Sequence, residues 1–353
     1  MKSSYFKGRG SQINTANKYL KNKYVQEHEE MLDEPLLNDE KTQIFYEHPK
    51  KIVNIINSPD IKGMYSMNPY QGCEHGCIYC YARNTHEYWG YSPGLDFERK
   101  IIAKPNAAAV LEKQLMNKNW EVSPIMFSGN TDCYQPVEQK LKITRQMLEV
   151  LLKFRHPVSM ITKNSLIKRD TDILQELARY KLVHVMISIT SLKEELRLKM
   201  EPRTAAAKNR LKVMEHLNKA GIPTGVMTAP IIPGLNSSEI PELIKAAADH
   251  GACAAGFTIV RLNGAIGDIF KDWIHKNFPD AADKVLNHIK EIHGGKVNDS
   301  RYGTRMRGEG KMAASIHQLF NMAVKKYLSG RDRFEYDLTA FRRPGEVQQL
   351  ELF

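Results

Sequence analysis

The stretch GMYSMNPYQGCEHGCIYCYAR, residues 63–83, joins a short apolar run to a loop that holds three of the chain's five cysteines. The run at 63–69 predicts a buried β-strand. The cysteines follow it with C-x3-C-x2-C spacing, at Cys73, Cys77 and Cys80. A structural zinc site needs four ligands, usually from two CxxC pairs, and the remaining Cys133 and Cys253 each stand alone. Three thiolates on four irons leave one iron free to bind something else, so the spacing favours an iron-sulfur cluster.

Downstream of this stretch, short apolar runs alternate with amphipathic segments, as in repeated strand and helix units. The candidate strands span 63–69, 124–129, 157–162, 182–190, 222–231 and 252–262. The candidate helices span 105–118, 138–154, 170–179, 205–220 and 237–250. This alternation predicts a parallel sheet wound in one direction. We therefore expect an α/β fold with a partial (β/α)6 TIM-type barrel; a flat doubly wound sheet is the alternative.

The 353 residues divide into four predicted parts. These are a basic N-terminal extension at 1–60, a core barrel at 61–265, a helical basic region at 266–343 and a tail at 344–353. No apolar run approaches the roughly 20 residues that span a bilayer, and the N-terminus lacks the apolar core of a secretion signal. We expect a soluble, cytoplasmic protein that does not bind membranes.

The net charge of +11 is concentrated at the two ends of the chain. Residues 1–23 carry six Lys and Arg and no acid, and residues 296–343 carry eleven basic and five acidic residues. Each end therefore contributes +6 and the middle is about neutral. Two basic flanks favour a polyanionic partner such as nucleic acid, and an ordinary solvated surface is the alternative.

The cysteine loop resembles that of the radical S-adenosylmethionine (SAM) enzymes. The resemblance implies that the three cysteines hold a [4Fe-4S] cluster whose fourth iron binds SAM. One electron then cleaves SAM to methionine and a 5′-deoxyadenosyl radical, which abstracts a hydrogen atom from the substrate. Tyr79 takes the place of the aromatic residue that commonly precedes the last cysteine. A flavodoxin- or ferredoxin-type reductant is the implied electron source.

Polar residues at the ends of later strands extend the resemblance across about residues 61–265. After the second strand, the superfamily often has a glycine-rich segment that ends in an acid facing the SAM amino group. This chain has Gly129, Asn130, Thr131 and Asp132 there, a departure from the common form. Related enzymes contact SAM at the ends of the third and fourth strands, here Lys163 and Ser188. Arg203 is a candidate partner for the SAM carboxylate. The alternatives are that Lys163 is an ordinary surface lysine and that Arg203 forms a helix-capping salt bridge.

The chain as a whole resembles uncharacterised bacterial proteins grouped with the spore photoproduct lyases, radical SAM enzymes that reverse a thymine dimer in DNA. The matching segments are GRG, NPYQGCEHGCIYCYAR, TDCYQP, EPR and RYGTRMRGEG. Such lyases use a cysteine near the end of the second strand as hydrogen donor to the product radical. Cys133 lies in that segment, a few residues later than the family pattern, and an inert buried thiol is the alternative.

Two further segments bear on nucleic acid. The stretch NDSRYGTRMRGEGK, 298–311, combines glycines with cations that can approach phosphates. Its candidate contacts are Arg301, Arg305, Arg307 and Lys311; a charged turn before a helix is the alternative. The terminal QLELF resembles the short peptide by which many bacterial DNA repair proteins bind the sliding clamp. Its candidate contacts are Gln349, Leu350, Leu352 and Phe353.

The sequence therefore predicts a radical SAM enzyme that acts on nucleic acid, with DNA favoured over RNA, in a DNA repair reaction of the lyase type. A second hypothesis keeps the radical chemistry but gives it an RNA, peptide or small-molecule substrate, because the fold does not choose the substrate. A third is a non-catalytic metal-binding module that only binds nucleic acid.

Overall fold

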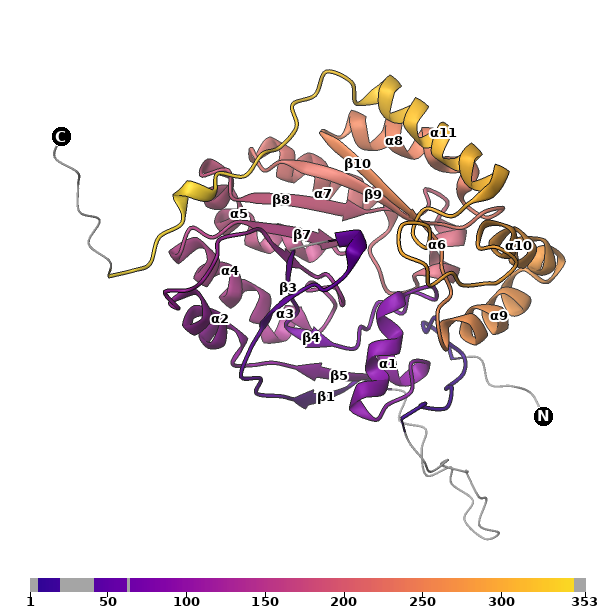
Figure 1. The fold of residues 1–353 in the computed structure, drawn as a ribbon, viewed down its shortest axis with the longest axis horizontal. Coiled ribbons are helices and arrows are strands. Elements are labelled where there is room, and N and C mark those ends of the chain that lie inside the picture. The colour runs from indigo at the N-terminus through magenta and orange to yellow at the C-terminus, as the bar shows by residue number, and fades with distance from the viewer. Residues whose placement is uncertain (1–5, 20–40, 62–63, 346–353) are drawn as a thin grey trace, which may run out of the picture.

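The computed structural model describes residues 6–19, 41–61 and 64–345. Within these ranges the central sheet has the strand order β10-β9-β8-β7-β6-β3-β2 (Figure 1). Its strands are β2 (Val53–Ile55), β3 (Tyr65–Met67), β6 (Ile125–Phe127), β7 (Val158–Thr162), β8 (Val183–Ser188), β9 (Thr224–Ile231) and β10 (Ala254–Ile259). Every pairing from β3 to β10 is parallel, and only β2 is antiparallel to its neighbour. The six predicted strands are therefore confirmed as the parallel part of an open, partial barrel.

The strands are short and apolar because both faces of the sheet are covered. In β8 the side chains of Val183, Val185 and Ile187 are buried at alternate positions, and β7 aligns Val158 with Val183. The intervening Met186 is only partly exposed. The carboxyl ends of all six parallel strands meet at one rim, where the chemistry of such folds resides.

Helices connect the parallel strands and cover the sheet. They are α2 (Ala107–Leu115), α3 (Glu138–Leu141), α4 (Ile143–Lys153), α5 (Thr171–Arg179), α6 (Glu194–Met200), α7 (Ala207–Lys219) and α8 (Ile240–Asp249). The single helix predicted at 138–154 is wrong, because Lys142 adopts a left-handed conformation (φ 54) between α3 and α4. The Glu138 carboxylate accepts a hydrogen bond from the Thr144 N–H (3.0 Å). This bond satisfies one of the free backbone N–H groups in the first turn of α4.

A second, small sheet lies beside the cysteine loop and was not predicted. Its order is β1-β5-β4, with β1 (Gln43–Tyr46) parallel to β5 (Lys100–Ala103) and β4 (Tyr70–Gln71) antiparallel to β5. Helix α1 (Leu95–Arg99) leads directly into β5, next to a 3-10 helix at Tyr81–Trp89 (Figure 1). This sheet supports the cysteine loop on the side away from the barrel strands.

The C-terminal region is helical, as predicted. It contains α9 (Ile266–Asn277), α10 (Pro279–Ile292) and α11 (Gly310–Tyr327). Helix α11 packs along α8 and closes the outer face of the barrel (Figure 1). Across the described ranges no helix has the length and hydropathy to cross a membrane. The predicted clamp-binding peptide at 349–353 lies outside the described residues.

Candidate functional site

The cysteine loop leaves β4 and lies over the carboxyl ends of the parallel strands. None of its three thiols is in a disulfide; Cys73 and Cys77 are buried and Cys80 is half-buried. The loop turns at Gly76, whose φ of 69 favours glycine. A Cβ at Gly76 would lie 2.8 Å from a carboxylate oxygen of Glu98, so a side chain there would disrupt the packing beneath the loop.

A buried ion pair fixes the loop from below. Arg83 and Glu98 have no exposed side-chain surface, and Nη2 of Arg83 lies 2.5 Å from Oε1 of Glu98. Arg83 also donates from Nε to the Cys77 carbonyl (2.9 Å). Glu98 accepts from the backbone N–H groups of Gly10 (3.0 Å) and Ser11 (2.8 Å). The pair therefore ties the cysteine loop, α1 and the N-terminal segment together.

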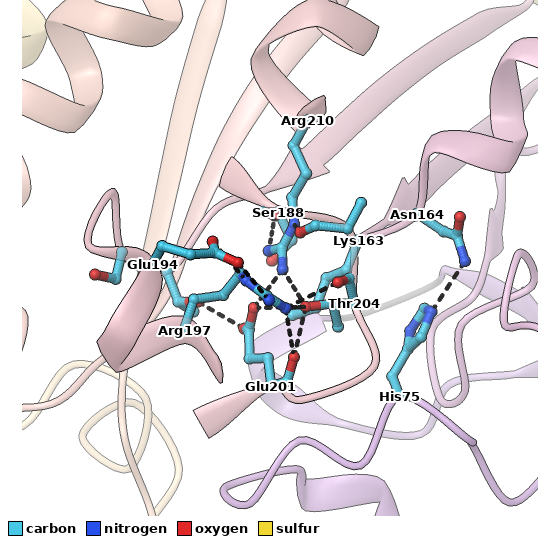
Figure 2. A network of polar contacts seen from close by, with 12 residues as sticks. His75, Lys163, Asn164, Ser188, Glu194, Arg197, Glu201, Thr204 and Arg210 are labelled. Atoms are coloured by element: carbon cyan, nitrogen blue, oxygen red, sulfur yellow. Dashed lines mark hydrogen bonds and ion pairs between the residues drawn. The ribbon is translucent and has the colours of Figure 1, made fainter. Parts of the chain in front are cut away.

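On the barrel side, His75 and Asp132 join the loop to the end of β7. His75 Nδ1 lies 3.3 Å from the Asp132 carboxylate, and its Nε2 lies 3.2 Å from Asn164 Nδ2 (Figure 2). The carboxylate also accepts from Thr162 Oγ1 and from the Lys163 N–H, each at 2.8 Å. Burial raises the pKa of Asp132, but the His75 charge and the donated hydrogen bonds outweigh burial and lower the pKa to about 2. Asp132 is therefore ionised and held in place.

A second buried ion pair, Glu201 with Arg210, lies under the barrel side of the loop (Figure 2). Arg210 Nη2 lies 2.6 Å from Glu201 Oε2, and Nη1 donates to the Ser188 carbonyl at the end of β8 (2.7 Å). Glu201 also accepts from the hydroxyls of Tyr79 and Thr190. The predicted cofactor residue Tyr79 is thus attached through its hydroxyl to Glu201, and the carboxylate connects the loop with the strand ends.

Two side chains in this region have no hydrogen-bond or ion-pair partner among the described residues and suit a polar ligand. The Ser188 hydroxyl is buried and has no hydrogen-bond partner among the described residues, which is costly unless a ligand supplies one. The Lys163 side chain forms no hydrogen bond or ion pair within the described part of the chain. Burial lowers the pKa of Lys163, but nearby Cys77 and Glu201 outweigh burial and raise it above its ordinary value. Lys163 is therefore a cation available to an anionic group.

The predicted carboxylate partner Arg203 lies beside the loop. Its N–H donates to the His75 carbonyl (3.3 Å), and its Nη1 lies 3.5 Å from the Glu74 carboxylate. The Arg203 side chain is about a third exposed (35%). The structure therefore brings Arg203 to the same loop as the cysteines.

The donor set fits a [4Fe-4S] cluster better than a single ion. Among the described residues no three His, Cys, Asp or Glu side chains converge on one metal ion. Thiolates that each bind a different iron need not converge. Burial, followed by the Glu201 charge, raises the pKa of Cys77 to about 12, and burial also raises the pKa of Cys73 and Cys80. Cluster binding must therefore displace thiol protons.

The predicted segment 129–131 packs against the start of the cysteine loop. The Asn130 N–H donates to Asn68 Oδ1 (3.0 Å), and the Thr131 hydroxyl donates to the Tyr70 carbonyl (2.6 Å). A Cβ at Gly129 would lie 2.7 Å from a side-chain oxygen of β3. These contacts place the segment next to the cluster site, and its contacts with SAM stay a prediction.

Cys133, the predicted hydrogen donor, has no exposed surface and belongs to the main hydrophobic core. Its N–H donates to Ser128 Oγ (2.9 Å), and its carbonyl accepts from the Thr144 hydroxyl (2.6 Å). Burial, followed by the Asp132 charge, raises the pKa of the thiol well above its ordinary value. The structure does not expose this thiol to a substrate, and its role as donor stays a prediction.

The basic stretch at 298–311 borders the open side of the barrel. The Ile259 N–H donates to the Met306 carbonyl (3.1 Å), which places the stretch along β10. Arg305 Nε lies 2.5 Å from the Asp60 carboxylate, and Arg305 Nη2 donates to Ser58 Oγ (2.8 Å). Because residues 58–60 precede β3, the stretch connects the two ends of the parallel sheet. We call residues 298–311 the rim loop.

The four predicted nucleic-acid contacts in the rim loop divide into two pairs. Arg301 is paired with Asp299 (2.9 Å) and Glu309 (2.6 Å), and Arg305 is paired with Asp60. Arg307 and Lys311 are exposed, and their side chains form no ion pair with any described residue. Only this second pair is available to bind phosphates without breaking an existing contact.

Sequence reasoning did not identify the two buried ion pairs. Arg83 ends the segment NPYQGCEHGCIYCYAR and Glu201 begins EPR, but their partners Glu98 and Arg210 lie in helices, where a charged residue usually faces water. The only sequence signal for these buried ion pairs was the position of Arg83 and Glu201 next to motif residues.

Residues 67–247 match the family model described as the radical SAM superfamily. An uncharacterized protein of Mycobacterium tuberculosis is 31% identical over 239 residues, which cover 67% of this chain and 69% of that protein. An uncharacterized protein of Methanocaldococcus jannaschii is 26% identical over 247 residues, which cover 70% of this chain and 88% of that protein.

Among solved structures, the fold is similar to that of spore photoproduct lyase. A complex of that enzyme with dinucleoside spore photoproduct matches with a TM-score of 0.58 and 16% identity, over 81% of this chain and 80% of the lyase chain. A mutant of the lyase with bound SAM and the same dinucleoside matches with a TM-score of 0.58 over 83% of this chain and 82% of the lyase chain. At this identity the similarity concerns the fold.

Proposed function

The chain belongs to the radical SAM superfamily, and from this premise we propose that it acts on nucleic acid, with DNA favoured over RNA, in a repair reaction of the lyase type. It is a radical SAM enzyme whose cofactors are a [4Fe-4S] cluster and SAM. When bound, these cofactors supply the radical that abstracts hydrogen from the substrate. We place the reaction in the cytoplasm, where thiols stay reduced.

The residues of this chain position the cofactors and exclude water. Cys73, Cys77 and Cys80 would hold the cluster. Ser188 and Lys163 would meet polar groups of SAM, because neither the Ser188 hydroxyl nor the Lys163 ammonium has a partner among the described residues. The two buried arginine–glutamate pairs orient the loop from opposite sides, so the reacting groups meet with little reorganisation.

The observation that carries the nucleic-acid proposal is the rim loop. It borders the open side of the barrel, and its Arg307 and Lys311 are exposed cations without ion pairs among the described residues. Cations at such a rim bind phosphates and position a polyanion over the site. The dinucleoside lesion bound by spore photoproduct lyase, which shares the fold, further supports a DNA substrate.

Salt-dependent retention on DNA and RNA columns tests this proposal. We expect the full chain to elute from duplex DNA at higher salt than from RNA of the same sequence, and the double variant Arg307→Ala, Lys311→Ala to elute earlier from DNA. Retention on neither polymer would contradict the proposal and favour a peptide or small-molecule substrate. Preferential retention on RNA would make RNA the substrate.

The terminal QLELF adds an independent proposal, that the chain binds the bacterial sliding clamp. A variant lacking the last five residues should lose co-elution with the clamp and still assemble its cluster. Unchanged co-elution would end this idea. The hydrogen-donor role of Cys133 is tested separately, because a Cys133→Ala enzyme that turned over without side products would exclude it.

A further inference from the structure

Residues 9–15, near the N-terminus, lie against the cysteine loop on the side of the buried Glu98. The backbone of Gly10 meets that of Gly76 directly, because a Cβ on Gly10 would overlap the Gly76 carbonyl oxygen. Gly76 has equally little room, since a Cβ there would lie 3.2 Å from the Gly10 nitrogen. Glycine at both positions therefore allows the two backbones to pack between Cys73 and Cys77. We call residues 9–15 the cover segment.

Buried hydrogen bonds attach the cover segment to α1. The N–H groups of Gly10 (3.0 Å) and Ser11 (2.8 Å) both donate to the Glu98 carboxylate, and Ser11 has no exposed surface. The Leu95 N–H donates to the Ile13 carbonyl (3.1 Å). The cover segment thus lies along α1, with these backbone polar groups paired away from water (Figure 1).

The Ile13 side chain packs on the apolar residues of the loop itself. It contacts the buried hydrophobic core that contains Cys77, Ile78 and Tyr79. Ile13 is partly exposed, whereas Ile78 has no exposed surface. The cover segment is therefore the outer layer over this part of the loop, and its removal would bring water to apolar side chains beside a cysteine.

Arg9 fixes the other end of the cover segment. Its side chain is almost fully buried, and its Nη1 donates to the Glu98 carbonyl (2.7 Å). Its Nη2 donates to Thr42 Oγ1 (3.4 Å), and the Thr42 hydroxyl donates to the Glu74 carboxylate of the loop (2.8 Å). Arg9 is one of the six basic residues in 1–23, and these contacts hold it against the loop instead of presenting it to a polyanion.

The contacts of the cover segment suit a unit that opens locally. The hydrogen bonds described above reach the loop, α1 and Thr42, and the core of the barrel lies elsewhere. Segments held by a few contacts at the surface open at a lower free energy than the core strands. Undocking of the cover segment would therefore release the cysteine loop while the parallel sheet stays folded.

We propose that the cover segment is a positioning element of the cluster site, which holds the cysteine loop in its cluster-binding arrangement and keeps water from the back of the loop. Docking of the cover segment and binding of the cluster then favour each other, because each stabilises the same closed loop. The inference rests on membership of the radical SAM superfamily and is independent of the nucleic-acid substrate.

Hydrogen–deuterium exchange of the full chain, with and without its reconstituted cluster and under anaerobic conditions, tests this coupling. The backbone amides of Gly10 and Ser11 should exchange about tenfold more slowly in the loaded protein. The amides of β8 should exchange equally in both forms, because they report on the whole barrel. Equal exchange of the cover segment with and without the cluster would overturn the proposal.

Gly10→Ala tests the proposal from the side of the cover segment. Gly10 does not adopt a left-handed conformation, so the cost of alanine is its clash with the Gly76 carbonyl. The loaded variant should release iron to EDTA about tenfold faster than the wild type, with unchanged exchange in β8. Ile13→Ala keeps the backbone contacts and should accelerate iron release less, which provides a second variant if Gly10→Ala does not load.

Gly8→Asn is the matched control. A Cβ at this exposed glycine would meet nothing within 4 Å, and asparagine tolerates its φ of 76. The control should release iron at the wild-type rate.

Two results in the variants would overturn the proposal. One is a wild-type rate of iron release in both Gly10→Ala and Ile13→Ala. The other is exchange that accelerates in β8 as much as in the cover segment, because the segment would then stabilise the whole fold and not the cluster site. Loss of DNA retention by the wild type would contradict the proposed substrate and leave this coupling intact.

Discussion

The two sides of the cysteine loop both contain a buried arginine–glutamate pair, but the two pairs are bonded to different parts of the chain. Below the loop, Glu98 accepts from Arg83 and from two backbone N–H groups, and aromatic rings fill the rest. On the barrel side, Glu201 and Arg210 are equally buried, yet the Ser188 hydroxyl beside them has no partner among the described residues. The lower pair joins segments of the chain to one another, so we assign it a structural role, whereas Ser188, whose hydroxyl has no partner among the described residues, makes the barrel side the candidate ligand site.

The largest expected effect comes from breaking the lower pair. In Glu98→Gln, Arg83 becomes a buried cation without its carboxylate, so the free energy of unfolding should fall by about 3–5 kcal/mol in denaturant titrations. The control is Glu309→Gln, whose exposed pair with Arg301 contributes about 1 kcal/mol or less. Similar losses in both variants would remove the structural assignment of the lower side.

The buried His86 ring, which packs against Phe97, should make stability depend on pH. Burial lowers the pKa of His86 to about 4 from its ordinary 6.5. Between these pH values the unfolded chain binds a proton on this ring and the folded chain does not. The stabilisation is complete above pH 6.5 and is lost as the pH falls toward 4, by up to about 3 kcal/mol. Unfolding free energies between pH 4 and 7 should fall less steeply in His86→Phe than in the wild type.

His275→Phe, which replaces a half-exposed histidine, is the control for this pH dependence and should keep the wild-type slope. His156, whose pKa is also lowered to about 4 by burial, and His184, whose pKa burial lowers, should contribute to the slope that remains in His86→Phe. Equal slopes in the wild type and His86→Phe would show that the ring is not held neutral in the interior.

On the barrel side, Ser188→Ala should affect ligand binding more than folding. Its hydroxyl has no hydrogen-bond partner among the described residues, so the free energy of unfolding should change by less than about 0.5 kcal/mol, whereas the Kd for SAM should rise about tenfold. Thr190→Val is the matched control, since it removes a hydrogen bond to Glu201 (2.6 Å) and should destabilise the fold. A Ser188→Ala protein with normal SAM affinity would contradict a ligand role for this hydroxyl.

The smallest effect per residue is expected at the rim loop. Replacing Arg307 and Lys311 with alanine should weaken DNA binding several-fold and reduce the slope of log affinity against log salt by about two. Arg301→Ala should change the slope less, because Arg301 already has two carboxylate partners. An unchanged slope in the double variant would remove these cations from the interface.

The strand pattern made most of the barrel predictable. Short apolar runs followed by helices specify parallel strands buried on both faces, and the cysteine spacing placed the site at their carboxyl ends. The break at Lys142 could not be foreseen, because it depends on contacts that only the folded chain shows. The Glu138 carboxylate accepts hydrogen bonds from the Thr144 N–H and the Tyr70 hydroxyl. The small sheet was missed since β4 has only two residues and its partners are distant in sequence.

The candidate site was less predictable than the fold. The cysteines and Ser188 could be singled out as candidates because motif spacing and strand ends are visible in a sequence. Arg83, Glu98 and Arg210 were not, because a charged residue in a helix normally faces water, and only the three-dimensional arrangement shows that these are paired in the interior.

Formation of 5′-deoxyadenosine from SAM is the most direct test of a radical SAM enzyme that acts on DNA. The full chain would be incubated anaerobically with dithionite and SAM, with ultraviolet-irradiated DNA, with RNA of the same sequence or with neither, and the product measured by chromatography. We predict that the product appears, that Cys77→Ala abolishes it and that DNA increases its rate above that with RNA. No product from a fully loaded cluster in the presence of DNA, or equal rates with and without DNA, would contradict the proposed function.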